Sequence, residues 1–322
     1  MSFVMGIDGG GTKTNTVIAD MDGRIIARAT GGPTNPNAVP RQKLENTLST
    51  MLQELKTQQP DAFENITSLF AGMSGAANDR MQDELKGILE QLVPDGVRIC
   101  VEADTINALY SGTYGEPGIV QISGTGSITF GINAKSEHAR VGGWGFLFGD
   151  EGSGYDIGRQ GIVAALKFQD GRGSETILLD MLRSYFDVTS EHELVQEIYA
   201  LPSPKDGIAP VSRIVFQAYI KNDQVARHII TDAAKEISLS IKTLYKKHFS
   251  PAKEVKAVLC GGIFNNKDIM PRLLESKLQD HPNINLTIPE MSPVGGSVIG
   301  AYLQQHKHVD QEFIQNIIST LN

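Results

Sequence analysis

The chain has 322 residues and a formal net charge of −8 at pH 7, from 29 Lys and Arg against 37 Asp and Glu. This acidic balance disfavours nucleic acid and anionic membranes as partners, although it is compatible with a local phosphate site. The length allows two domains of ordinary size. No apolar run reaches membrane-spanning length and no basic leader opens the chain, so we expect a soluble, cytoplasmic protein with no membrane partner.

The first motif follows a short apolar strand at the N-terminus. The segment Asp8–Thr14 reads Asp-Gly-Gly-Gly-Thr-Lys-Thr, and another apolar, β-branched run follows at once. The glycines therefore predict a hairpin turn whose backbone N–H groups can surround an anion. Thr12, Lys13 and Thr14 add donors, and Asp8 suits a hydrated Mg²⁺ beside phosphate oxygens.

This motif differs from the two common phosphate loops. A Walker A loop needs Lys directly after its last glycine, but Thr12 intervenes here and a strand rather than a helix follows. The dinucleotide-binding spacing G-x-G-x-x-G also fails, because Thr14 occupies the position of the last glycine. A hairpin without a ligand is therefore the alternative for this segment taken alone.

The elements expected next have the pattern of an α/β unit. A third strand and a loop rich in Pro and Asn lead into a helix, and strands and helices then alternate. The expected ranges are strand 24–30, loop 31–40, a helix with apolar residues from Leu44 to Leu55, strand 66–73, helix 78–92, strand 97–103 and helix 105–112. We place the first boundary before Pro117. Asp104 stands between the last strand and the last helix, where it could serve as the N-cap of that helix.

The second half of the chain begins as the first half does. An apolar strand over 118–122 leads into Ser123-Gly124-Thr125-Gly126-Ser127, and a strand over 128–132 follows. The same pattern thus occurs twice: a strand, a turn of glycines and hydroxyl residues, and another strand. This repeat predicts two related domains. Two such turns that face one cleft would bind a polyphosphate from both sides, which favours a ligand at both turns.

A second glycine-rich segment precedes the helical part. Residues 142–154 contain the only Trp, six glycines and the pair Asp150-Glu151, and a helix is expected over 155–168. Either Asp150 or Ser153 could cap this helix; alternatively, the segment forms the wall of a sugar site, with its carboxylates on sugar hydroxyls. Beyond residue 173 the chain is expected to be mostly helical. A strand over 255–260 then ends in Gly261-Gly262, where an adenine ring could approach the backbone, and a helix, a strand over 284–287 and a helix over 294–305 follow.

Four segments in this order resemble one family. They are Gly6–Thr14, Ser123–Ser127, Gly142–Ser153 and Cys260–Gly262. Together they resemble the BadF/BadG/BcrA/BcrD ATPase family, and within it the N-acetylglucosamine kinase branch. The resemblance implies the α/β fold of the sugar kinase/heat-shock/actin superfamily, with two ribonuclease-H-like lobes and a nucleotide and sugar cleft between them. The expected lobes are residues 1–116 and 117–305, and a C-terminal helix at about 306–322 could complete the first.

The resemblance also implies ATP and Mg²⁺ as cofactors and roles for individual residues. The residues implied for ATP are Gly10, Gly11, Thr12, Lys13, Thr125 and Gly262, with Gly262 beside the adenosine. The residues implied for the sugar are Asn35, Asp104, Ser127, Gly143, Trp144, Gly145 and Asp150. Asp104 further matches the carboxylate that removes the proton from the sugar 6-hydroxyl.

The expected function is therefore an ATP-dependent kinase acting on the 6-hydroxyl of an amino sugar. N-acetylglucosamine is the first candidate, and N-acetylmuramic acid and glucosamine are related ones. One alternative is the ATPase activator of a 2-hydroxyacyl-CoA dehydratase or benzoyl-CoA reductase system, which needs a cysteine-ligated iron–sulfur cluster. Cys100 and Cys260 instead read as reduced core residues in separate strands. A sugar or nucleotide sensor without catalysis is a further alternative. A homodimer is compatible with the resemblance.

Overall fold

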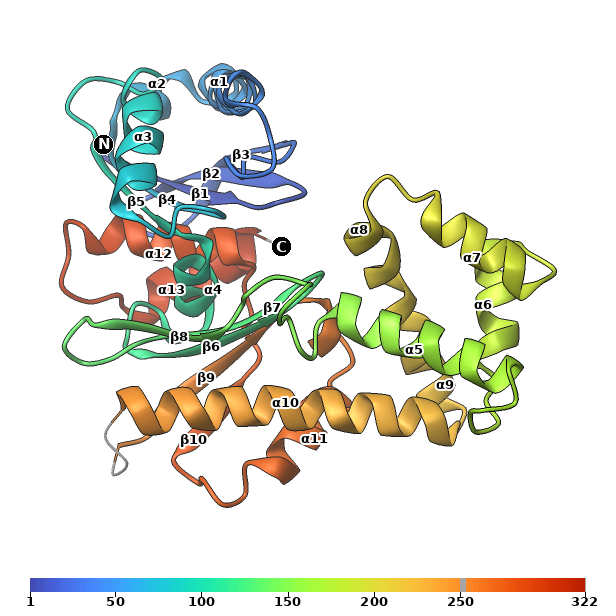
Figure 1. The fold of residues 1–322 in the computed structure, drawn as a ribbon. Coiled ribbons are helices and arrows are strands. Elements are labelled where there is room, and N and C mark those ends of the chain that lie inside the picture. The colour runs from blue at the N-terminus through green and yellow to red at the C-terminus, as the bar shows by residue number, and fades with distance from the viewer. Residues whose placement is uncertain (250–252, 322) are drawn as a thin grey trace. The chain divides into compact units, whose positions relative to one another are not determined.

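The computed structural model describes residues 1–249 and 253–321. The chain forms two compact units (Figure 1). Unit 1 comprises residues 1–117 together with the segment that begins at Pro289, and unit 2 comprises Gly118–Ile288. Among the described residues, no helix combines the length and the apolar composition that a membrane span needs.

Unit 1 is built on a five-stranded sheet with the order β3-β2-β1-β4-β5. The strands are β1 (Phe3–Gly9), β2 (Thr14–Asp20), β3 (Ile25–Gly31), β4 (Ile66–Met73) and β5 (Arg98–Ala103). The first three form an antiparallel meander, as the sequence predicted, and β4 and β5 run parallel to β1. Parallel neighbours end at the same sheet edge, so the residues that follow β1, β4 and β5 gather at one edge.

Helices cover both faces of this sheet (Figure 1). They are α1 (Arg41–Gln58), α2 (Pro60–Glu64), α3 (Asp79–Glu90), α4 (Asp104–Thr113), α12 (Pro293–Leu303) and α13 (Gln311–Leu321). The apolar face of α1 is buried from Leu44 to Leu55, at the helical spacing that predicted it. On the other face α4 and α12 approach so closely that a Cβ on Gly296 would lie 2.0 Å from the backbone oxygen of Asn107.

The position of α12 differs from the expected domain division. The sequence placed residues 117–305 in one lobe, whereas the segment from 289 onward belongs to unit 1. Most of α12 is buried, because its residues are small or apolar on every side. It also accepts a hydrogen bond of 2.7 Å at the carbonyl of Ala301 from the Ser68 hydroxyl in β4.

Unit 2 repeats the strand order of unit 1. Its sheet has the order β10-β9-β6-β7-β8. The strands are β6 (Gly118–Ser123), β7 (Ser127–Ile132), β8 (His138–Gly142), β9 (Val255–Cys260) and β10 (Ile284–Thr287). Again three antiparallel strands are followed by two parallel ones. The sequence did not predict β8, because its residues are exposed or half-buried and provide no apolar run.

The remaining part of unit 2 is helical, as predicted for the stretch beyond residue 173. Its helices are α5 (Gly154–Gln169), α6 (Leu178–Phe186), α7 (Glu191–Tyr199), α8 (Pro204–Ile208), η1 (Ala209–Val211), α9 (Ser212–Ile220), α10 (Gln224–His248), η2 (Gly262–Phe264) and α11 (Met270–Lys277). The long helix α10 packs on the sheet with the apolar residues from Ile229 to Leu244. The same core includes Ile157 of α5, and α5 packs on α10.

Candidate active site

The turn between β1 and β2 is open toward a ligand. Gly10 N–H donates to Lys13 O over 2.9 Å, and this bond closes the turn. Among the backbone hydrogen bonds of the described residues, none engages the N–H groups of Gly11, Thr12 or Lys13, and all three residues are exposed. Such a row of free donors forms an anion-binding concavity.

Thr14 takes no part in this concavity. Its side chain is fully buried, and its hydroxyl donates to the carbonyl of Gly32 over 2.8 Å. The same hydroxyl lies 2.8 Å from that of Thr34. The expectation that Thr14 adds a donor for phosphate is therefore wrong, because Thr14 is the first residue of β2 and its side chain faces the loop that follows β3.

Asp8 lies at the carboxyl end of β1 and is held by Asn107 of α4. The Asn107 amide donates to Asp8 Oδ1 over 3.0 Å and to the carbonyls of Ile7 and Gly72 over 3.1 Å each. Burial raises the pKa of Asp8, while the hydrogen bond from Asn107 and the charge of Lys13 oppose the rise. Asn107 was missed in the sequence, although it stands three residues after Asp104 and hence on the same face of the helix.

The Asp8 carboxylate fits a hydrated cation. Asn107 occupies one of its oxygens, and the buried Asn107 Oδ1 beside it has no hydrogen-bond partner among the described residues. Mg²⁺ keeps several waters and binds few protein carboxylates when phosphates complete its shell. One carboxylate and one amide oxygen suit that arrangement.

Asp104 is the first residue of α4, but it is not the cap of that helix. The N-cap is Ala103, whose methyl side chain makes no capping hydrogen bond. Burial and the negative charge of Asp8 raise the pKa of Asp104 to about 6, while the Ser74 hydroxyl and the Thr105 N–H favour its charged form. A pKa near the working pH is what a general base needs.

Ser74 connects Asp104 with Asn35. The amide nitrogen of Asn35 donates to the Ser74 hydroxyl over 3.3 Å, and Asn35 Oδ1 accepts from the N–H of Asn37 over 2.9 Å. The structure therefore brings Asn35 and Asp104, which are distant in the sequence, to one Ser74 side chain at the end of β4. Ser74 was not among the expected site residues, since its motif gave no sign beyond a strand end followed by glycine.

In unit 2, the turn between β6 and β7 rests on a buried polar cluster. Gln121 donates to the hydroxyls of Ser123 and Ser127 over 3.0 Å each, and the Thr129 hydroxyl donates to Gln121. The turn itself is closed by a 2.9 Å bond from Gly124 N–H to Gly126 O. This cluster holds together the two strand ends that flank the turn. Gln121 was not predicted as a site residue from the sequence.

The start of α5 is bonded to the same turn. Gly154 N–H donates to the carbonyl of Gly124 over 2.7 Å. The cap of α5 is Ser153, whose hydroxyl accepts from Asp156 N–H over 3.1 Å, so the choice between Asp150 and Ser153 is decided. Asp150 is free for another role.

The glycine-rich segment before α5 combines glycines in the left-handed backbone region with an exposed aromatic ring. Gly143 and Gly145 have φ of 68° and 87°, and the Trp144 side chain is 66% exposed. The guanidinium of Arg140 lies 4.2 Å from the centre of the Trp144 ring. Asp150, by contrast, is buried.

Gly262 lies beside the turn of unit 2. It begins η2, and only Gly261 separates it from the end of β9. The pairing of Cys260 with Ile122 places the end of β9 next to Ser123. Cys260 is buried in this strand and Cys100 is half-buried in β5 of unit 1, where burial raises the pKa of its thiol to about 11. The raised pKa of Cys100 disfavours the thiolate form that a metal ligand needs.

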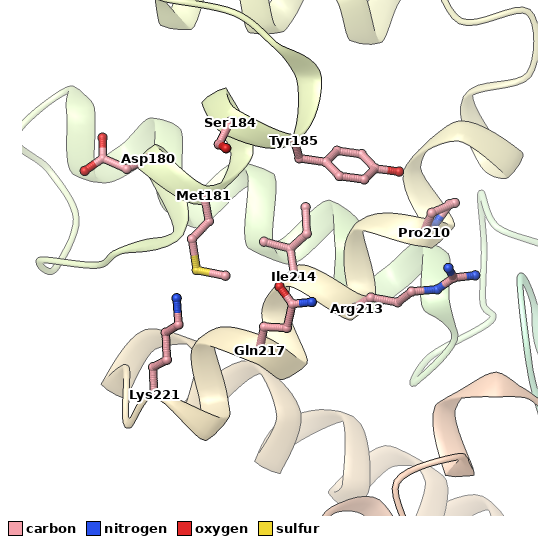
Figure 2. Close-up of a pocket in the computed structure, with 9 residues that line it drawn as sticks. All are labelled: Asp180, Met181, Ser184, Tyr185, Pro210, Arg213, Ile214, Gln217 and Lys221. Carbon is pink, nitrogen blue, oxygen red and sulfur yellow. The ribbon is translucent and has the colours of Figure 1, made fainter.

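A separate hollow of about 640 Å³ lies elsewhere in unit 2, between α6 and α9 (Figure 2). Tyr185 and Arg213 are among the residues that line it. It contains none of the residues expected for ATP or sugar. It is therefore not part of the candidate site.

Comparison with known proteins assigns the family. The model of the BadF/BadG/BcrA/BcrD ATPase family matches residues 5–303. The chain belongs to this family. The membership confirms the resemblance read from the four motifs.

Two relatives of this family member are sugar kinases. One is an N-acetylmuramic acid/N-acetylglucosamine kinase of Clostridium acetobutylicum, 38% identical over 83% of this chain and 87% of the relative. Another is an N-acetyl-D-glucosamine kinase of Dictyostelium discoideum, 32% identical over 92% of this chain and 96% of the relative.

Solved structures confirm the expected fold. A ROK family glucokinase from Streptomyces griseus, in complex with glucose and AMPPNP, has a TM-score of 0.60 at 16% identity and covers 95% of this chain and 100% of its own. A Chromobacterium violaceum protein, whose name as an N-acetylglucosamine kinase is provisional, reaches a TM-score of 0.72 at 24% identity, with 93% and 98% covered. The chain thus has the two-sheet α/β fold of sugar kinases.

Proposed function

We propose that this family member is an ATP-dependent kinase that phosphorylates the 6-hydroxyl of an amino sugar. The observation that carries the proposal is the setting of Asp104, a carboxylate with a pKa of about 6 beside Ser74 and Asn35. The kinases named among its relatives supply the substrate class: N-acetylglucosamine first, then N-acetylmuramic acid and, from a Vibrio cholerae relative 26% identical over 77% of this chain, glucosamine.

Asp104 acts as the general base in this proposal. Above about pH 6 its carboxylate is ionised and accepts the proton of the 6-hydroxyl, while Asn35 and Ser74 orient the sugar. The hydroxyl oxygen then bonds to the γ-phosphorus of ATP, the bond from that phosphorus to the β,γ-bridging oxygen breaks, and ADP leaves. General base catalysis of this kind contributes roughly 10²–10⁴-fold.

The two glycine turns hold the phosphates in this proposal. Phosphoryl transfer asks mainly for positioning and for stabilisation of charge. The first turn, which Gly10 closes, offers the free N–H groups of Gly11, Thr12 and Lys13, and the second turn offers Thr125. Ser127, Gly143, Trp144, Gly145 and Asp150 serve the sugar, and Gly262 lies beside the adenosine.

Asp8 and Asn107 would hold a hydrated Mg²⁺. When bound, this ion neutralises part of the phosphate charge. An ion pair between a phosphate oxygen and Lys13 is expected to neutralise further phosphate charge. A cytoplasmic location fits the use of ATP, and a homodimer is a further expectation that light scattering would test.

The activator alternative has less support. The relatives at 38% and 32% identity are named as sugar kinases. Cys100 and Cys260 lie in the sheets of different units, each within a strand. A sensor without catalysis would not need a carboxylate tuned as Asp104 is.

The test is an ADP-release assay with four sugars: N-acetylglucosamine, N-acetylmuramic acid, glucosamine and glucose. We expect turnover with at least one of the amino sugars. The matched control is 6-deoxy-N-acetylglucosamine, which lacks only the accepting hydroxyl and should give no turnover above that without sugar. ADP release that is equal with and without every sugar would refute the proposal.

A further inference from the structure

Asp150 has a charged neighbour, Lys205, that has no role in the function described so far. The ammonium of Lys205 lies 3.5 Å from Asp150 Oδ2. The Asp150 side chain is 5% exposed and that of Lys205 is 33% exposed. Asp150 Oδ2 accepts no hydrogen bond from any described residue, so Lys205 balances its charge without bonding it closely. A buried carboxylate left with so loose a partner is costly for the fold.

This pair lies directly at the turn between β6 and β7. A Cβ built on Gly126 would lie 2.8 Å from Asp150 Oδ2 and 3.2 Å from Lys205 Nζ. A side chain at Gly126 would therefore press on the buried carboxylate and crowd the ammonium beside it. Thr125, the residue expected to contact phosphate, is the immediate neighbour of Gly126 in this turn.

The backbone of Lys205 is held in place by packing, whereas its ammonium group can move. Lys205 belongs to α8, whose Ile208 is buried against α5. The first residue of α5 in turn bonds the carbonyl of Gly124. One packed assembly thus holds α8 and the turn, and the ammonium reaches the turn from a side chain with freedom to rotate.

We propose that Lys205 is a phosphate-binding residue of unit 2: its ammonium binds an oxygen of the terminal phosphates of ATP at the turn of Thr125. A lysine ammonium has three donors, so it can bond a phosphate oxygen and still face Asp150. Without this cation, the buried Asp150 carboxylate would repel the phosphates, and such repulsion is strong where water is scarce. The inference rests on one part of the proposed function, namely that the turn at Thr125 binds the phosphates of ATP.

The experiment compares Lys205→Met, Lys205→Arg and a matched control, Lys242→Met. Lys242 of α10 also pairs with an aspartate of unit 2, since its Nζ lies 2.6 Å from Asp280 Oδ1. It is none of the residues assigned to ATP or to the sugar. Affinity for AMPPNP with Mg²⁺ is measured by calorimetry without sugar, and KM for ATP and for the sugar by steady-state kinetics. Because a charged hydrogen bond is lost, we expect Lys205→Met to weaken nucleotide binding about 10- to 100-fold.

The remaining variants distinguish a direct contact of Lys205 with phosphate from an indirect effect. Lys205→Arg keeps the charge and should recover most of the affinity, and Lys242→Met should bind as the wild type does. Unchanged nucleotide affinity in Lys205→Met would overturn the proposal. So would a rise confined to KM for the sugar, because Lys205 would then act only through Asp150. Thermal unfolding checks that each variant is folded, and Lys205→Gln replaces any that is not.

Failure of the sugar-kinase proposal would give a different result from failure of the Lys205 proposal. If the wild type binds AMPPNP but phosphorylates none of the sugars, the sugar-kinase proposal fails. The calorimetric comparison of Lys205→Met with the wild type still decides the role of Lys205 in that case.

Discussion

Replacing Asp104 by asparagine separates catalysis from stability. Asparagine has the same shape but cannot accept the proton of a hydroxyl at neutral pH, so turnover should fall by roughly 10²–10⁴-fold. ATP binding should persist, because the turn at Thr12 is untouched. The matched control is Asp79→Asn, since Asp79 is also the first residue of a helix, α3, and is exposed. This control should keep the wild-type rate.

Asp104→Asn should raise the stability of the folded protein, although it lowers turnover. A pKa that rises from 3.8 to about 6 on folding means that the ionised form of Asp104 is destabilised by roughly 3 kcal/mol in the folded state. The stabilising contribution of the raised pKa is complete below pH 3.8 and is lost as the pH rises through about 6. The asparagine side chain stays neutral at every pH, so Asp104→Asn should be the more stable protein at pH 7 to 8, by up to that amount, with no such gain near pH 4.

The assays are a pH–rate profile and thermal or urea unfolding at several pH values. In the wild type, kcat should fall below about pH 6 as Asp104 takes up a proton. Near wild-type turnover by Asp104→Asn would refute the assignment of the base, which would then be sought at Asp150. A variant that loses both activity and stability at pH 7 would instead show that the carboxylate is needed for the fold.

Three further predictions concern the turn between β1 and β2, Asn107 and the alternative function as an activator ATPase. Thr12→Val should raise KM for ATP with little change in the melting temperature of the protein without ligand, and unaltered kinetics would make the first turn purely structural. Asn107→Leu should lower the free energy of unfolding by about 3 kcal/mol, because buried acceptors at Ile7 and Gly72 lose their donor; urea unfolding measures this, and an unchanged midpoint would contradict it. Protein purified without oxygen should contain no stoichiometric iron or acid-labile sulfide, and elemental analysis that finds both would favour the activator ATPase.

Much of the fold could be predicted because its signals are local. Strand β4 was expected over the residues that form it, and the buried face of α1 follows from apolar residues at helical spacing. The likeness of Ser123–Ser127 to Asp8–Thr14 predicted two related domains, and the sheets of the two units do have the same strand order. Strand β8 was missed since its exposed residues have no apolar pattern, and only pairing with β7 defines it.

The candidate site was less predictable, because its bonds join distant parts of the chain. Asp104 was singled out by resemblance, but no spacing indicates that Ser74 lies beside both Asp104 and Asn35. The same holds for Asn107, whose bonds to Asp8 span 99 positions. Burial, which raises the pKa of Asp104, is a property of the folded unit alone.

The late position of α12 in the chain has a consequence for synthesis. Unit 2 is a continuous stretch, whereas unit 1 needs the segment from Pro289 onward. A ribosome that has released residues 1–117 has therefore delivered a sheet whose β1 and β4 still lack the helix that packs on them. Domains tend to fold as units when their sequence is complete. The unit that is translated first is thus the one that is finished last, and until then its uncovered apolar face is open to chaperones or to aggregation.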